Sequence, residues 1–143
     1  MSTINSSLQL LMSLAKAQAT VSRRMDRLNA HGIGFTDFVI LHLLHQAPNG
    51  KLRRKDLAEK TNLTPSGITR LLLPIEKIGL IDREANERDA RVSYVVLTAA
   101  GRRTYEEAKP TADALAEDLI PADQLKKYTA AAALFKLLGA TII

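Results

Sequence analysis

Residues 55–101 read KDLAEKTNLTPSGITRLLLPIEKIGLIDREANERDARVSYVVLTAAG, and this stretch decides the fold. Its beginning predicts a short helix that ends at a turn around Asn62. Thr64 then stands at an N-cap position and Pro65 at the first helical position, where a missing N–H costs nothing because it has no helical partner. Apolar residues recur at helical spacing as far as Ile78. Two helices of this size, joined by a turn of about three or four residues, predict a helix-turn-helix.

The pattern changes after Gly79, which ends the second helix. Residues 80–83 and 92–97 have the short, period-two pattern of strands, and the second run is rich in β-branched and aromatic side chains. Residues 84–91 between them are polar apart from two alanines. These features predict a β-hairpin with a charged, projecting tip. The order helix, helix, hairpin is typical of a winged helix-turn-helix.

Longer helices are predicted on both sides of this unit. Residues 5–30 are helical, with an apolar face wider than the about 100° that one core requires, which indicates a second surface to cover. A second helix, capped by Thr36 or Asp37, follows residues 31–34 and stops at residues 47–50.

The region after the hairpin is predicted to be helical as well. Thr98 is expected to cap a helix that Pro110 kinks or interrupts, and Pro121 is expected to divide two helices near the end. The fold class expected for the whole chain is mainly α (α+β).

Composition limits the classes of protein that fit. A length of 143 residues suits one domain, with a content of 46% hydrophobic and 24% charged residues that is typical of a folded protein. The absence of Cys excludes disulfides, thiolate metal sites and thiol-based redox sensing. No signal segment and no run of about 18 apolar residues is found, so we expect a cytoplasmic protein without a membrane partner.

Positive charge is concentrated in the middle of the chain. Residues 51–105 hold twelve Lys or Arg and seven Asp or Glu, a net charge of +5. Residues 1–50 carry +2 and residues 106–143 carry −2, which gives the total of +5. A polyanionic partner would therefore meet the middle third.

The second helix of the helix-turn-helix is the first candidate for contact with DNA. Small residues in its first turn would let the backbone approach the major groove, hydroxyls can reach phosphates or base edges, and Arg can bind guanine through two hydrogen bonds. The candidate residues are Thr64, Pro65, Ser66, Gly67, Thr69 and Arg70.

The hairpin tip and a basic run are two further candidates. An Arg on a thin loop, such as Arg88 or Arg91, can enter the minor groove, and Asp89 fits against DNA only if it orients an Arg. Cations at the start of the first helix of the pair oppose the helix dipole, which a nearby phosphate would offset. This run comprises Lys51, Arg53, Arg54 and Lys55.

Each of these features alone also fits an ordinary solvated surface. Amphipathic helices, polar turns and basic runs are common in proteins that bind no nucleic acid. The three features fall within about 40 residues and in one supersecondary order, and this coincidence favours double-stranded DNA as the partner.

The region from Phe35 to Ala108 resembles the DNA-binding core of the MarR family (multiple antibiotic resistance regulators). The resemblance lies in Asp56-Leu57-Ala58, in residues 63–70 and 76–83, in Arg88-Asp89-Ala90-Arg91, and in Leu97-Thr98-Ala99-Ala100-Gly101. The Asp-x-Arg of the hairpin followed by Leu-Thr-x-x-Gly is the specific part.

The resemblance implies a single MarR-like domain over residues 1–143. Segments 1–34 and 109–143 would be dimerisation helices, and segment 35–108 would be the winged-helix core. The core would have a recognition helix from Thr64 to Ile78 and a wing whose Arg91, held by Asp89, enters the minor groove. The dimer interface is expected to contain Leu8, Leu11, Met12, Leu125, Tyr128, Ala132, Phe135 and Leu138.

The same resemblance implies a homodimeric transcription regulator, not an enzyme. Many members of the family are repressors of a pseudo-palindromic operator that small, often phenolic, effectors release. Two departures stand out: Pro74 within the recognition helix is expected to kink it, and the lack of Cys excludes the peroxide-sensing branch. No cofactor and no metal are expected.

Three other functions remain open on the residues alone. A weakly specific architectural protein would bind any duplex with similar affinity, and a winged-helix module for protein assembly would bind none. A metal enzyme is the weakest alternative, because it rests on His42 and His45 at i, i+3 spacing with Asp37; His31 is the remaining histidine.

Overall fold

A computed structural model describes residues 3–143, so the first two residues of the predicted segment 1–34 lie outside the described residues. The elements in chain order are helices α1 (Ser6–Met25), η1 (Asp26–His31), α2 (Phe35–Gln46) and η2 (Pro48–Gly50), strand β1 (Lys51–Arg53), helices α3 (Arg54–Thr61) and α4 (Pro65–Lys77), strands β2 (Ile81–Ala85) and β3 (Ser93–Leu97), and helices α5 (Ala99–Leu119), η3 (Ala122–Lys127) and α6 (Tyr128–Leu137).

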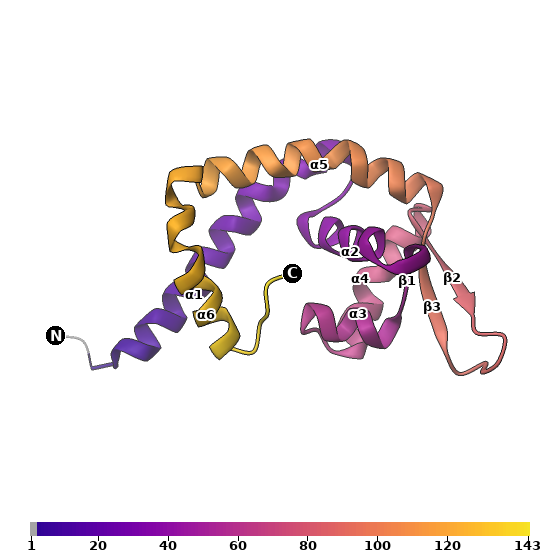
Figure 1. Ribbon diagram of the computed structural model, residues 1–143, viewed down its shortest axis with the longest axis horizontal. Coiled ribbons are helices and arrows are strands. Elements are labelled where there is room, and N and C mark those ends of the chain that lie inside the picture. The colour runs from indigo at the N-terminus through magenta and orange to yellow at the C-terminus, as the bar shows by residue number, and fades with distance from the viewer. Residues whose placement is uncertain (1–2) are drawn as a thin grey trace.

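The chain forms a winged lobe and an arm, joined along α5 (Figure 1). The lobe contains α2, α3, α4 and the sheet, from which the β2–β3 hairpin projects. The arm contains α1 and α6, which lie side by side and line a common pocket. This arrangement confirms the expected mainly helical winged helix-turn-helix with long terminal helices.

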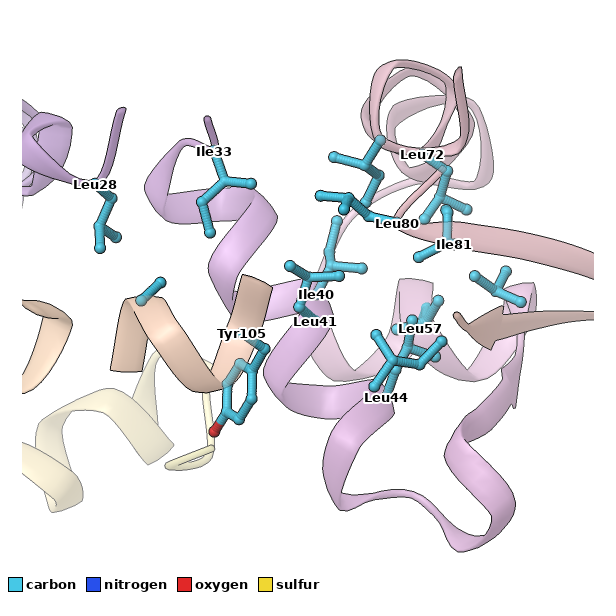
Figure 2. Packing of buried hydrophobic residues seen from close by; sticks show 14 of the residues in the cluster. Leu28, Ile33, Ile40, Leu41, Leu44, Leu57, Leu72, Leu80, Ile81 and Tyr105 are labelled. Atoms are coloured by element: carbon cyan, nitrogen blue, oxygen red, sulfur yellow. The ribbon is translucent and has the colours of Figure 1, made fainter. Parts of the chain in front are cut away.

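The core lies where α2 is enclosed by the other elements of the lobe. Figure 2 shows Ile40 and Leu41 of α2 between Tyr105 of α5 on one side and Leu72 and Leu80 on the other. All five side chains are buried. Because α5 supplies Tyr105 to this core and also continues into the arm, the two parts share one packed helix.

The sheet has a strand that sequence analysis did not predict. Residues 51–53 were predicted only as the basic run before α3, but they form β1, which pairs antiparallel with β3 and gives the strand order β1-β3-β2. Three residues are too few to show a strand period, and their pairing partner, Tyr94–Val96, lies about 40 residues further along the chain. The hairpin itself is confirmed, with its strands at 81–85 and 93–97 instead of 80–83 and 92–97.

Helix ends follow the local sequence with two corrections. The predicted helix at residues 5–30 is α-helical only to Met25 and continues as the 3₁₀-helix η1. The cap of α2 is Gly34, whose N–H donates to the Asp37 carboxylate at 2.9 Å, so Asp37 acts from the first turn and Thr36 is not the cap. Gly79 adopts φ +84° after α4, as an end-of-helix glycine should.

The internal prolines do not break their helices. α4 continues through Pro74, and α5 continues through Pro110, so of the two outcomes expected at Pro110, a kink or an interruption, the interruption is wrong. Pro121 does separate α5 from η3 and α6. Over residues 3–143, none of the helices combines the length and the apolar character that crossing a membrane requires.

Gly101 is predicted to be indispensable for the junction between α4, β3 and α5. A Cβ atom there would overlap the backbone oxygen of Leu80 and lie 2.8 Å from Leu97 Cδ1. We expect Gly101→Ala to lower the free energy of unfolding by about 3 kcal/mol, because a backbone carbonyl cannot move aside as a side chain can.

Urea denaturation followed by circular dichroism measures this change. Gly34→Ala is the matched control, because its added Cβ would meet only Asp37 Oδ2 at an ordinary 3.6 Å. Equal unfolding free energies for the two variants would contradict the role assigned to Gly101.

Candidate nucleic-acid interface

The first turn of α4 is exposed and rigidly capped. Thr64 Oγ1 accepts from the N–H of Gly67 at 3.0 Å and lies 3.2 Å from the Ser66 hydroxyl. Thr64, Pro65 and Ser66 are exposed, and Gly67 is half-buried. The small residues predicted to approach DNA therefore lie together at an accessible helix N-terminus, where the helix dipole favours a phosphate.

Thr69 and Arg70 differ in how free their side chains are. The Thr69 hydroxyl donates to the Pro65 carbonyl at 2.9 Å and accepts from Arg54 Nη1 at 3.1 Å, so its proton is already engaged. Arg70 is exposed, and nothing within residues 3–143 is bonded to its guanidinium. Of this pair, Arg70 is the side chain available to a ligand.

The basic residues at the start of α3 differ in their contacts. Arg53 binds the Asp56 carboxylate through Nε at 3.1 Å and Nη2 at 3.3 Å, and this hydrogen bonding raises the pKa of Arg53. Arg54 is half-buried and directed at Thr69, with its Nε buried and without a partner. Lys55 is exposed, and no partner is found for it among the described residues.

These contacts change the interpretation of the run. Asp56 in the first turn of α3 offsets the unfavourable cations, a contribution that the sequence analysis did not consider. Arg54 positions α4 against α3 through Thr69, a link that depends on tertiary packing and has no sequence signal. Lys51 is engaged too, because its Nζ lies 2.8 Å from Glu84 Oε1 and 4.9 Å from the centre of the Tyr94 ring.

The tip of the wing has an internal scaffold. The Asn86 side-chain oxygen accepts from the N–H groups of Arg88 at 2.8 Å and Asp89 at 3.2 Å, and its amide donates to the Tyr94 hydroxyl at 3.3 Å. Asn86 was not among the site residues predicted from the sequence, although an Asn at the start of a polar turn is a known signal for such bonds. The turn is therefore fixed at its base while its tip extends into solvent (Figure 1).

Asp89 and Arg91 form the ion pair that sequence analysis anticipated. Arg91 Nε lies 3.1 Å from Asp89 Oδ1 and Nη2 lies 3.2 Å from Oδ2, and the backbone N–H of Arg91 donates to Oδ1 at 3.0 Å. The side chain of Arg91 is nevertheless 91% exposed. These hydrogen bonds lower the pKa of Asp89. The geometry therefore holds a guanidinium outward in one orientation.

The wing is also tied to α4. Arg83 Nε at the start of the hairpin lies 3.0 Å from Glu76 Oε2 of α4. The ion pair joins the two elements that carry Arg70 and Arg91, so their relative position is restrained by more than the sheet. Figure 1 shows the hairpin tip and α3 on the side of the lobe that faces away from α5.

The histidines have protein partners. His42 Nδ1 lies 2.7 Å from the Tyr105 hydroxyl, and burial, then the nearby His45 and Lys109, lower the pKa of His42. Asp37, the suggested third ligand, is bonded to Gly34 instead. Residues 3–143 contain no group of three or more His, Asp or Glu arranged to hold a metal ion.

The arm leaves an extended apolar surface uncovered. Every residue of α1 before Thr20 is exposed, and Met25 is its single buried residue. All the residues expected at a dimer interface are exposed except Ala132, which is half-buried: Leu8, Leu11, Met12, Leu125, Tyr128, Phe135 and Leu138. Exposed apolar patches of large area are typical of surfaces that bind another protein or a membrane.

A cavity of about 640 Å³ lies between arm and lobe. It is bounded by α1, α2 and α5, and its walls are mainly apolar, with Val21, Phe35 and Phe38 among them and Asp113 as its one charged lining residue. A cavity with apolar walls and few polar groups has the character of a site for a small, mainly apolar molecule.

Comparison with known proteins identifies related sequences. A sequence model of the MarR family matches residues 35–93. The HTH-type transcriptional repressor YetL of Bacillus subtilis (strain 168) is 30% identical over 109 residues, which cover 73% of this chain and 63% of YetL. The HTH-type transcriptional regulator MhqR of the same organism is 28% identical over 96 residues, covering 66% of this chain and 65% of MhqR. The chain thus spans less than two thirds of either relative.

Solved structures share the fold over nearly the whole chain. Sco3205, a MarR family transcriptional regulator from Streptomyces coelicolor solved in complex with DNA, has a TM-score of 0.79 at 20% identity, covering 97% of this chain and 89% of its own. The organohalide-sensing regulator RdhR-CbdbA1625, solved with 2,4-dichlorophenol, has a TM-score of 0.81 at 19% identity, covering 94% of this chain and 80% of its own. At these identities the likeness is one of fold.

The carboxyl group of Asp89 is predicted to titrate below its ordinary pKa for as long as Arg91 is present. In Arg91→Ala the loss of the two guanidinium hydrogen bonds should raise the pKa of Asp89 toward the ordinary Asp range, while the backbone N–H of residue 91 still donates to the carboxylate; carboxyl ¹³C NMR titration measures this rise. Because a lowered folded-state pKa means that the charged form is favoured, the pair is intact at neutral pH and is lost as pH falls through that pKa. Arg88→Ala is the control, and an unchanged Asp89 titration in Arg91→Ala would refute the pairing.

Proposed function

The chain belongs to the MarR family, and from this premise we propose that it is a homodimeric transcription regulator that binds double-stranded DNA. α4 would enter the major groove and the wing the neighbouring minor groove. The relatives that match are transcription regulators and not enzymes, as expected from the sequence.

The orientation of Arg91 is the observation that carries the proposal. Holding a guanidinium outward against Asp89 while 91% of the side chain is exposed contributes little to stability, because exposed ion pairs are weak. It does pre-order a cation on a thin hairpin. Such a cation fits a narrow minor groove, where negative potential is highest.

The start of α4 supports the major-groove contact. Its exposed first turn offers small side chains at the positive end of the helix dipole, and Arg70, which has no partner among residues 3–143, lies one turn further along. Lys55 can add a phosphate contact. Arg53 and Arg54 would serve mainly to hold α3 and α4 in place, because both are engaged within the protein.

The uncovered arm supports a homodimer. α1 has one buried residue in twenty, so a single chain leaves it largely without packing. A two-fold dimer through α1 and α6 would present two copies of α4 to successive major grooves about 34 Å apart. Its operator would then be a pseudo-palindrome.

Repression with release by a small effector is the regulatory mode we propose. YetL is named a repressor, and RdhR-CbdbA1625 was solved with a dichlorophenol. The apolar cavity between α1, α2 and α5 lies where a ligand would alter the angle between arm and lobe. Suppose that a phenolic effector binds more tightly to a dimer whose two α4 helices are wrongly spaced for DNA. It would then shift the population toward that dimer and release the operator.

Two other functions make different predictions. An architectural protein would bind all duplexes within a few-fold, whereas a regulator should prefer its operator by roughly 10³-fold or more. A protein-assembly module would bind no duplex. The pre-ordered Arg91 favours DNA over assembly.

Binding to the DNA that flanks its own gene tests the proposal. Fluorescence anisotropy at several salt concentrations, with random duplex as competitor, should show an operator preference and a steep loss of affinity with salt. Equal affinity for operator and random duplex would favour the architectural function, and no binding at low salt would favour assembly.

In this assay the two exposed arginines should behave differently. Arg91→Ala should weaken binding to all duplexes without changing thermal stability, because the wing tip packs against no core. Arg70→Ala should weaken operator binding by about tenfold or more and relax base preference at one position in each half-site. Unchanged preference in Arg70→Ala would count against base reading by this residue.

Leu11→Asp is predicted to dissociate the dimer, because it would bury a carboxylate in the apolar arm interface. Sedimentation equilibrium should then give the mass of one chain instead of two. Ile78→Asp, a change at an exposed apolar position on the lobe, should leave the mass unchanged. A wild-type protein that sediments as a single chain would contradict the dimer.

A further inference from the structure

α4 carries a large apolar side chain on its exposed face. Leu73 is 50% exposed, whereas Leu72 beside it is 2% exposed and packs in the core. The buried face of the helix contains Ile68, Leu72 and Ile75. Leu73 therefore lies opposite the core, on the face that the proposed function turns toward DNA.

The neighbours of Leu73 on that face are polar. Seven residues, about two helical turns, separate Ser66 from Leu73, and three separate Arg70 from Leu73, so the three side chains form one row. Lys77 continues the row one turn further, and all four residues are exposed. An isolated exposed Leu is common in proteins, but this one stands inside a row of groups suited to a DNA groove.

We propose that Leu73 reads the 5-methyl group of a thymine at the base pair next to the one bound by Arg70. The methyl group is the only apolar feature that a base pair displays in the major groove, and apolar side chains recognise it by contact. This inference rests on the proposed function and adds to it the base that the third turn of α4 selects.

The spacing supports adjacent base pairs. Three residues advance about 4.5 Å along a helix axis, close to the about 3.4 Å between neighbouring bases on one strand. Leu73 also points back toward the helix N-terminus, as helical side chains do, and so toward the end of α4 that enters the groove.

The residues beside Leu73 offer no competing hydrogen-bonding group to a base at this level of α4. The Thr69 hydroxyl, which could otherwise compete for a base edge, already donates to the Pro65 carbonyl and accepts from Arg54. Pro74, the next residue, is exposed and has no N–H to offer. At this level of the helix the exposed surface is apolar and suited to a methyl group.

Replacing thymine with deoxyuridine tests the proposal, because it removes only the methyl group. The wild-type protein first selects its preferred duplex from a random library, and Arg70→Ala then locates the base pair that Arg70 reads. Copies of this duplex are made, each with one dT replaced by dU. The affinity of each copy is measured for the wild-type protein, for Leu73→Ala and for the control Ile78→Ala; the Ile78 side chain is exposed at the far end of α4.

At the neighbouring base pair, replacing dT with dU should lower the affinity of the wild-type protein about fourfold per half-site. This is the fold-change that corresponds to the free energy of burying one methyl group. Ile78→Ala should show the same loss. Leu73→Ala should bind the dT and dU duplexes equally, and 5-methylcytosine on the same strand should restore part of the wild-type affinity.

Three results would overturn the inference while leaving the proposed function standing. They are an unchanged dU effect in Leu73→Ala, no dU effect in the wild type, and a selected G·C pair at that position. A change of oligomeric mass in Leu73→Ala without a change in the dU effect would assign the side chain to a contact between copies. A wild-type protein that selects no duplex refutes the proposed function itself.

Discussion

The close approach of α5 to the end of α4 is the constraint on which the rest of the structure depends. Thr98 donates its hydroxyl to the Gly79 carbonyl at 2.6 Å and its N–H to the Leu80 carbonyl at 3.2 Å, and it also caps α5 by accepting from the N–H of Gly101. Only glycine fits at position 101. One point thus fixes the end of the helix that carries Arg70, the base of the wing and the start of the helix that leads into the arm.

Features coded by neighbouring residues could be predicted from the sequence. The cap at Thr64, the stop at Gly79 and the pairing of Asp89 with Arg91 each involve residues a few positions apart, so local chemistry determines them. Strand β1 could not be predicted, because its partner is distant in sequence. The engagement of Arg54 with Thr69 was missed for the same reason. The helical flanks and the hairpin were predicted, since their periodicity extends over many residues.

The candidate interface is organised as much by internal bonds as by free charge. Arg53, Arg54, Lys51 and Arg83 are each engaged within the protein, whereas Arg70 and Lys55 have no partner among the described residues. Counting basic residues in the sequence therefore overestimates the number available to a phosphate. What remains is a small set of cations on a framework whose geometry is already set, and this lowers the entropy lost on binding.

The sparse packing of α1 has a consequence for how the protein behaves at low abundance. A helix with one buried residue obtains most of its stabilisation from the second chain of the proposed dimer, so assembly and folding of the arm are linked by mass action. Dilution would loosen the arm before it affected the winged lobe, whose core is complete within one chain. The cellular amount of the protein would then set the fraction of copies competent for DNA as well as the occupancy of each site.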